Sequence, residues 1–135
     1  MKKGVIAFVL MLSLVLLCGC SGYTKSYSAT LLITSVHGDD ASMEFHTFSG
    51  TYNFKLKRDG AREHTLDVEA SLAEGEMNIY VGVGGEKDLL FTLRGGESCD
   101  KTIPLDSKYD NEKTIYVILE TAEKCKKGDF EFEYN

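Results

Sequence analysis

The chain has 135 residues, a formal net charge of −6 and a hydrophobic content of 43%. This length is enough for one domain with a core of its own and too short for two. The acidic balance disfavours nucleic acid as a partner, because phosphate backbones are bound mainly by Lys and Arg.

The first 19 residues have the layout of a secretory signal peptide. Lys2 and Lys3 precede an apolar run from Val5 to Leu17, in which Ser13 is the polar interruption. We expect this signal to form a short helix and to be removed. The run of about 13 residues is shorter than the roughly 20 that a helix needs to cross a bilayer. A permanent membrane span is therefore disfavoured.

The signal ends in Leu17-Cys18-Gly19-Cys20, which resembles the lipobox of bacterial lipoproteins. The resemblance implies cleavage between Gly19 and Cys20, a diacylglycerol on the Cys20 thiol, and attachment to the extracytoplasmic face of the cell membrane. Two acyl chains on one cysteine suffice for stable attachment. Cys18 departs from the family, which more often has Ala or Ser at that position. An ordinary secreted signal and an uncleaved anchor are the alternatives.

Cleavage would divide the chain into a signal peptide (1–19), a short tether (20–27) and a single domain (28–135). Removal of the signal leaves 116 residues and lowers the net charge to −8, because Lys2 and Lys3 are lost. Seven peptide steps join Cys20 to Tyr27, which reach about 25 Å when extended. We therefore expect a domain that works close to the membrane, with its negative charge keeping it off anionic headgroups.

Two cysteines, Cys99 and Cys125, remain in the exported domain. Thiols in an oxidising compartment often pair, so we predict a disulfide between them. Closing this loop would stabilise the fold by roughly 3.5 kcal/mol in the chain-entropy model. The alternative is two unpaired thiols in separate strands.

Beyond the tether, apolar and polar residues alternate with the period of two that is typical of half-buried strands. The residues 114–120 are apolar almost throughout, which indicates a central strand covered on both faces, and 104–112 is a polar loop with room for one helical turn. In chain order we predict strands over 27–36, 43–48, 52–57, 66–72, 77–83, 89–93, 99–103, 114–120 and 130–134.

Eight or nine short strands at this spacing predict an all-β fold, an antiparallel β-sandwich or jelly roll. The clearest hairpin joins 52–57 to 66–72 through a turn at Asp59-Gly60.

Parts of this pattern resemble known secreted proteins. The stretch from Phe48 to Tyr52, the stretch from Gly75 to Val81 and the strand that ends at Tyr134 are similar to small lipoproteins of Gram-positive bacteria whose function is not characterised. They are more distantly similar to the β-sandwich modules appended to secreted peptidases. The resemblance implies the fold and adds little about function, because sandwiches carry many unrelated functions.

The sequence offers little catalytic chemistry. The histidines His37, His46 and His64 lie in different segments and do not have the spacing of metal ligands. Gly96-Glu97-Ser98-Cys99 lacks the form of a nucleophile elbow. We therefore predict a protein that is not an enzyme and needs no cofactor.

Two weaker patterns point to binding. Asp39-Asp40 and the loop with Asp106 and Asp110 carry oxygen ligands that suit calcium, although neither follows an EF-hand pattern and solvated acidic turns explain them too. Lys124, Lys126 and Lys127 flank Cys125 and suggest a local binding patch or a solvated strand end.

These observations favour a lipid-anchored module that binds an envelope protein. The alternatives are a glycan- or calcium-binding surface domain and a small envelope enzyme.

Overall fold

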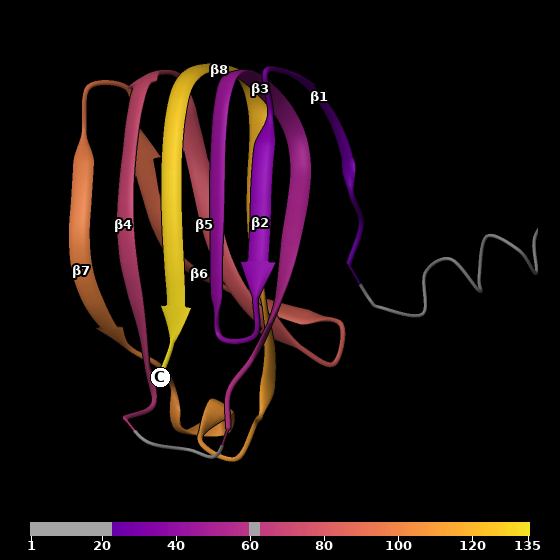
Figure 1. Cartoon of the computed structure of the whole chain (residues 1–135), viewed down its shortest axis with the longest axis vertical. Coiled ribbons are helices and arrows are strands. Elements are labelled where there is room, and N and C mark those ends of the chain that lie inside the picture. Colours follow the sequence, from indigo (N-terminus) through magenta and orange to yellow (C-terminus); the bar gives the residue numbers. More distant parts are fainter. Residues whose placement is uncertain (1–22, 60–62) are drawn as a thin grey trace, which may run out of the picture.

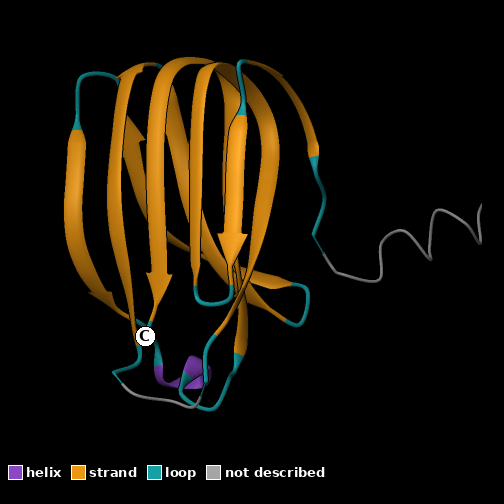
Figure 2. Ribbon diagram, viewed as in Figure 1, coloured by secondary structure: helices purple, strands orange, loops and turns teal. Residues whose placement is uncertain are grey.

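The structure is a computed structural model that describes residues 23–59 and 63–135. This part of the chain is almost entirely strand, with one 3-10 turn as its helical piece (Figure 2). The all-β, antiparallel prediction is confirmed. The elements are β1 (Ser26–Thr30), β2 (Ile33–His37), β3 (Asp40–Lys57), β4 (Thr65–Glu74), β5 (Glu76–Val83), β6 (Glu86–Arg94), β7 (Ser98–Pro104), η1 (Ser107–Tyr109) and β8 (Thr114–Tyr134).

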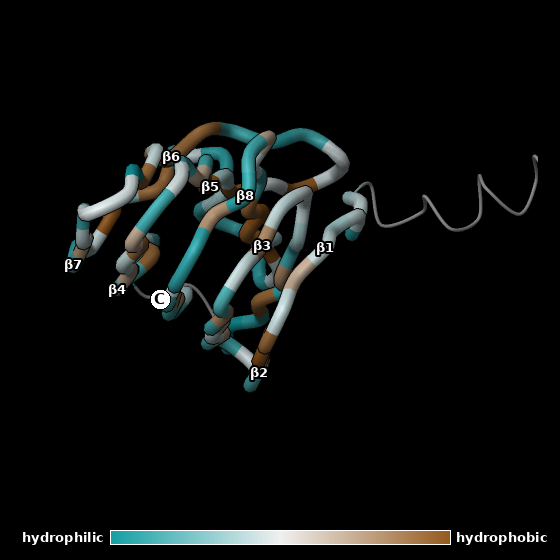
Figure 3. The backbone as a smooth tube through the Cα atoms, turned by 90° about the horizontal axis from the view of Figure 1, so that it is seen from above, coloured by the Kyte–Doolittle hydropathy of each residue, from teal (hydrophilic) through white to brown (hydrophobic). Residues whose placement is uncertain are grey.

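The strands form one antiparallel sheet that folds back on itself into two facing layers (Figure 1). The front layer contains β2, β4, β7, residues 40–47 of β3 and residues 126–134 of β8. The back layer contains β5, β6 and the remaining halves of β3 and β8. Seen from above, the layers are joined where these two long strands cross from one to the other (Figure 3). The sandwich is thus one continuous sheet.

The crossing point, or crest, depends on an irregularity in the pairing of β3 with β8. The register against β8 shifts between Phe48 and Gly50, so that Ser49 faces the three residues 122–124. Extra residues on one strand of a pair bend it sharply. Gly50 has a φ of +108°, and a Cβ there would lie 2.2 Å from the Ser26 carbonyl oxygen. Only glycine allows β1 to pair so closely at the bend.

Several predicted strands are therefore parts of longer ones. The segments 43–48 and 52–57 both belong to β3, and 114–120 and 130–134 both belong to β8. In contrast, the predicted strand 27–36 is divided into β1 and β2 by Leu31, which has a φ of +49°. Glycine inside a strand marks a bend here, not an end.

The predicted hairpin at Asp59-Gly60 is wrong. β3 and β4 do not pair with each other, because β8 lies between them and pairs with both. Gly60 itself lies outside the described residues. An Asp-Gly dipeptide permits a tight turn, but it does not select the neighbour of a strand.

The core lies between the layers, where alternate side chains of both point inward. Its largest members are aromatic, and their rings pack against one another. The ring centroids of Phe45 and Phe130 are 6.1 Å apart, and those of Phe54 and Phe132 are 6.3 Å apart. The fully buried large side chains are Met43, Phe48, Phe54, Leu56, Leu66, Met77, Ile79, Ile115, Ile118, Phe130, Phe132 and Tyr134. Burial of Ile115 and Ile118 confirms that 114–120 is a central strand.

The end of the sandwich away from the crest is closed by the turn η1, within the loop predicted to hold a helical turn. Tyr109 of η1 is 2% exposed. Its hydroxyl donates to Asp88 Oδ2 at 2.6 Å, and the same carboxylate lies 2.5 Å from Lys108 Nζ. Burial, together with this bond, raises the pKa of Tyr109, so the hydroxyl stays a donor.

Candidate functional site

The two residues at the predicted cleavage site, Gly19 and Cys20, lie outside the described residues, so lipidation stays a prediction. Among the residues that are described, no helix has the length and apolar character needed to cross a membrane.

The predicted disulfide is not formed. Cys99 on β7 and Cys125 on β8 are both free thiols and both buried. In the front layer β4 lies between their strands, and two inter-strand spacings are about 9.5 Å. Bridged Cα atoms lie within roughly 7 Å of each other. The alternative of two unpaired thiols in separate strands is the correct one.

The suggested calcium ligands make different contacts in different parts of the fold. Asp106 accepts a hydrogen bond from the Lys108 amide and caps η1, and Asp110 lies 3.5 Å from His64. The Asp39 carbonyl accepts from the Tyr134 amide at 2.7 Å, whereas Asp40 is exposed on β3. In the described ranges no three His, Cys, Asp or Glu side chains are grouped as a metal site.

The three histidines also stay apart. His37 Nε2 lies 2.9 Å from Ser35 Oγ on β2, His46 is exposed near the crest, and His64 lies beside η1. The lysines Lys124 and Lys127 are exposed at the crest, and the intervening Lys126 lies 3.6 Å from Glu74. These residues lie at or near the surface in different parts of the fold.

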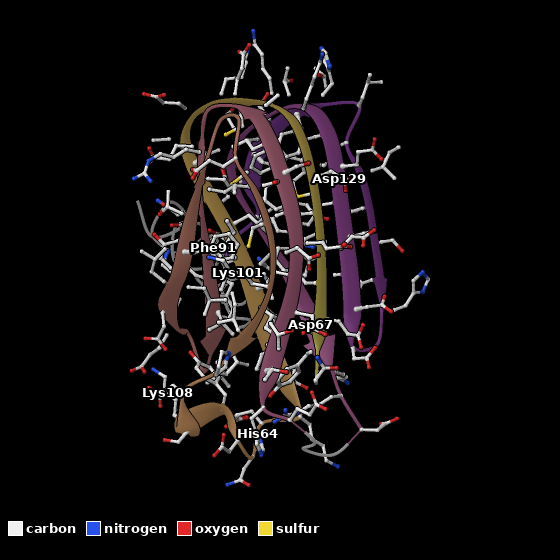
Figure 4. The ribbon with its side chains drawn as sticks, turned by 90° about the vertical axis from the view of Figure 1, so that its left-hand side faces the viewer. His64, Asp67, Phe91, Lys101, Lys108 and Asp129 are labelled. Atoms are coloured by element: carbon white, nitrogen blue, oxygen red, sulfur yellow. The ribbon has the colours of Figure 1, made fainter. Side chains whose placement is uncertain are left out.

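The outer face of the front layer gathers most of the chemistry. Along β3, β8 and β4 every second side chain points into the core, so the alternate residues, which are largely acidic, share the opposite side (Figure 4, where Asp67 and Asp129 are labelled). We call this surface the acidic face. Its eight carboxylates are Asp40, Glu44, Asp67, Glu69, Asp100, Asp129, Glu131 and Glu133.

The strand register arranges the acidic face in rows. The central row runs Ser42, Glu131, Glu69 and Asp100 across β3, β8, β4 and β7. A second row runs Asp40, Glu133, Asp67 and Thr102, and a third runs Glu44, Asp129, Ser71 and Ser98. Five directly opposed pairs join two carboxylates, an arrangement that is destabilising by itself. Within the described residues none of the eight forms an ion pair with a Lys or Arg side chain.

The centre of the acidic face holds two carboxyl groups in direct contact. A hydrogen bond between Glu69 and Glu131 raises the pKa of Glu69, and the nearby Asp100 raises it further. Two carboxylates this close repel each other, so a proton shared between them is favoured. This pair therefore attracts positive charge.

The acidic face is hollowed over these rows. The hollow has a volume of about 580 Å³, within the range of small-ligand sites. Carboxylates and hydroxyls dominate its polar lining, and no aromatic ring except that of Phe132, which points into the core, belongs to a lining residue. The lining residues are Asp40, Ala41, Ser42, Asp67, Val68, Glu69, Asp100, Lys101, Thr102, Glu131, Phe132 and Glu133.

A buried arginine that the sequence did not reveal lies at the opposite end from the crest. Arg58 is 5% exposed, and its guanidinium lies 4.0 Å from the centre of the Tyr134 ring. It donates to the main-chain oxygens of Tyr109, Asp110 and Asn135. These contacts tie three chain segments together, so we assign Arg58 a structural role.

Comparisons with known proteins do not assign a family. No family model matches the chain, and no curated protein matches it.

Several solved structures are distantly similar to this chain. A family 29 carbohydrate-binding module in complex with mannohexaose is 21% identical, with 84% of this chain and 78% of that chain covered and a TM-score of 0.43. A cupin-2 domain protein from Shewanella frigidimarina is 18% identical, with 100% and 99% covered and a TM-score of 0.34. Xylanase10C from Cellvibrio japonicus is 11% identical, with 83% and 25% covered and a TM-score of 0.43. At these TM-scores the similarities transfer no ligand or activity to this chain.

Proposed function

We propose that this chain is a lipid-anchored, non-catalytic binding module on the extracytoplasmic face of the membrane, and that it binds a Lys- and Arg-rich protein segment on the acidic face. The observation that carries the proposal is the set of eight carboxylates in register, without ion-pair partners among the described residues. Exposed charges of one sign attract a partner of the other sign and speed its association.

The cost of this arrangement supports a role in binding. Like charges placed opposite each other on neighbouring strands destabilise a sheet. A basic partner would relieve that repulsion, so part of its binding energy would come from strain already present in the free protein. Glu69 and Glu131 at the centre would gain most, because their carboxyl groups touch.

The same pair argues against a glycoside hydrolase. A retaining enzyme holds its two carboxyl groups about 5 Å apart, and an inverting enzyme holds them further apart. The hydrogen bond between Glu69 and Glu131 that raises the pKa of Glu69 requires the two groups to be closer than either of these spacings.

A glycan is the second candidate, because the hollow offers Ser42, Thr102 and carboxylates to sugar hydroxyls. Glycan sites commonly add an aromatic ring against which the sugar stacks. The hollow presents no such ring outward, so a basic protein segment is favoured.

The test compares two variants with equal loss of charge. One carries Asp67→Asn, Glu69→Gln and Glu131→Gln on the acidic face, and the other carries Asp59→Asn, Glu63→Gln and Glu123→Gln at exposed positions elsewhere. Crosslinking in intact cells identifies the partner, and titration with the purified partner gives the affinity. Each exposed pair contributes up to about 1 kcal/mol, so the first variant should bind roughly 10- to 100-fold more weakly.

The second variant should bind like the wild type, and wild-type affinity should fall with added salt because exposed charges are screened. Equal binding by both variants, or affinity that does not depend on salt, would overturn the assignment to the acidic face. Binding of a neutral mannan or glucan that the first variant abolishes would establish the glycan candidate instead.

A further inference from the structure

The residues just before β1 are packed on the outer face of the back layer. The Tyr23 hydroxyl donates to the Glu86 carbonyl at 2.6 Å, and the Tyr23 ring lies 4.6 Å from that of Tyr116. Gly82 leaves the space for this ring, since a Cβ there would lie 2.5 Å from the Tyr23 hydroxyl. Tyr23 therefore lies across β8 and β5.

The next two residues continue this contact. Asn53 of β3 is 7% exposed, and its Nδ2 donates to the Thr24 carbonyl at 3.0 Å. Lys25 Nζ lies 4.7 Å above the Tyr52 ring. Without residue 24 the buried Asn53 amide would lose this partner, and an unpaired buried donor is destabilising. We call residues 23–25 the strap.

The strap shortens the link to the proposed lipid. Cys20 is three peptide steps from Tyr23 in the sequence, a reach of about 10 Å at most. The tether predicted to end at Tyr27 thus ends at Tyr23. A lipid on Cys20 would hold the outer face of the back layer within about one headgroup layer of the bilayer.

The composition of that face suits such a position. Register places Lys55, Tyr116, Gly82 and Lys87 in one row across β3, β8, β5 and β6. The neighbouring row contains Tyr80, which carries Lys87 Nζ 4.4 Å above its ring, and Leu89, which is 56% exposed. Tyrosine and lysine favour the boundary between lipid and water. We call this surface the lysine–tyrosine face.

We propose that the strap holds the lysine–tyrosine face against the anionic headgroups of the bilayer and turns the acidic face away from the membrane. The two faces belong to opposite layers, so the eight carboxylates of the acidic face lie on the far side of the domain. On the lysine–tyrosine face itself, Glu120 is neutralised by Lys87, whose Nζ lies 2.5 Å from its Oε1. Lys55 and Lys57 of β3 are outside the ion pairs of the described residues. Lysines near an anionic surface are attracted to it. This inference rests on the lipid anchor of the proposed function, and not on the identity of the partner.

The experiment uses the full acylated chain, purified in detergent from bacterial membranes and reconstituted in vesicles of phosphatidylglycerol and phosphatidylcholine. A membrane-impermeant amine reagent modifies the lysines, and mass spectrometry compares each lysine in vesicles and in detergent. We expect loss of modification at Lys55, Lys57 and Lys87 in vesicles. Lys101 at the front-layer edge and Lys127 at the crest are internal controls and should be modified equally in both states.

Sedimentation with the vesicles separates the two ways of failing. A chain that sediments but shows equal modification of all five lysines keeps its anchor and overturns the orientation. A chain that does not sediment overturns the anchor and the orientation together.

A strap variant gives an independent check. Tyr23→Ala removes the ring from Tyr116 and should restore modification of Lys55 and Lys87 without loss of sedimentation. Tyr23→Phe keeps the ring, so Lys55 and Lys87 should stay protected from the amine reagent in this variant. Protection that survives in Tyr23→Ala would show that the strap does not set the orientation.

Discussion

The carboxylates of Glu69 and Glu131 repel each other at the centre of the acidic face. The raised pKa of Glu69 means that the folded protein binds this proton more tightly than the unfolded chain does. The resulting stabilisation is complete below the usual value of 4.5 and is lost as the pH rises through the raised pKa. At neutral pH the charged pair therefore weakens the fold.

We expect Glu69→Gln to raise the free energy of unfolding at neutral pH, because the amide cannot repel Glu131. The gain over the wild type should vanish at about pH 3, well below the usual value of 4.5, where Glu69 is protonated in both states. Urea unfolding at neutral pH and at the low pH measures this gain in the free energy of unfolding. Glu123→Gln, at an exposed crest position, is the control and should change little at either pH. A Glu69→Gln variant that is no more stable at neutral pH would contradict the pairing.

At the scale of elements, η1 closes the end of the sandwich away from the crest through the side chains of Lys108 and Tyr109, which both contact Asp88. The Tyr109 hydroxyl donates to Asp88 on β6, and the hydrogen bonds from Lys108 and Tyr109 lower the pKa of Asp88. The loop that looked merely polar in the sequence therefore has a buried anchor. Tyr109 stands alone among polar residues, with no periodic pattern to mark it as part of the core.

Tyr109→Phe should lower the free energy of unfolding by about 2 kcal/mol, as expected for a hydrogen bond to a charged group. The measurement is urea unfolding, with Tyr80→Phe as the control: its ring packs under Lys87, and loss of its hydroxyl should cost less than about 0.5 kcal/mol. The pKa of Asp88, followed by NMR, should rise in Tyr109→Phe. Equal stability of the two variants would show that the hydroxyl does not fasten η1.

Periodicity was enough to predict most strands, their inward faces and the all-β class, because burial enforces alternation in segments such as 66–72 and 130–134. It could not predict neighbours. Glu69 and Glu131 are 62 positions apart and meet only because β8 inserts between β3 and β4. Nor could it distinguish a bend from an end, as Gly50 shows, since a glycine permits both.

For the whole molecule, the two buried thiols bear on how the fold is stabilised. Cys125 is 0% exposed, and burial raises the pKa of Cys99, so both react poorly in the folded state. No covalent link closes the chain between them. Packing of the two layers must therefore supply the stability.

In the chain with Cys18→Ala and Cys20→Ala, reductant should leave the unfolding temperature unchanged. A thiol reagent should modify Cys99 and Cys125 only after denaturation, and the mass should show two additions. If a bridge were present, its reduction would lower the free energy of unfolding by about 3.5 kcal/mol. The unfolding temperature would then fall by roughly 10 to 20 degrees. Any such fall would contradict the free thiols.

The passage of β8 through both layers has a consequence for how the protein is made. β8 follows every other strand in the chain, yet it is the central partner of β3, β4 and β5. A nascent chain, which emerges from its N-terminus, can complete neither layer until β8 has been synthesised. The back layer needs the first half of β8, and the front layer needs its residues 126–134. If the chain is exported in extended form, as the proposed signal peptide requires, this topology would delay completion of the fold until most of the chain has crossed the membrane.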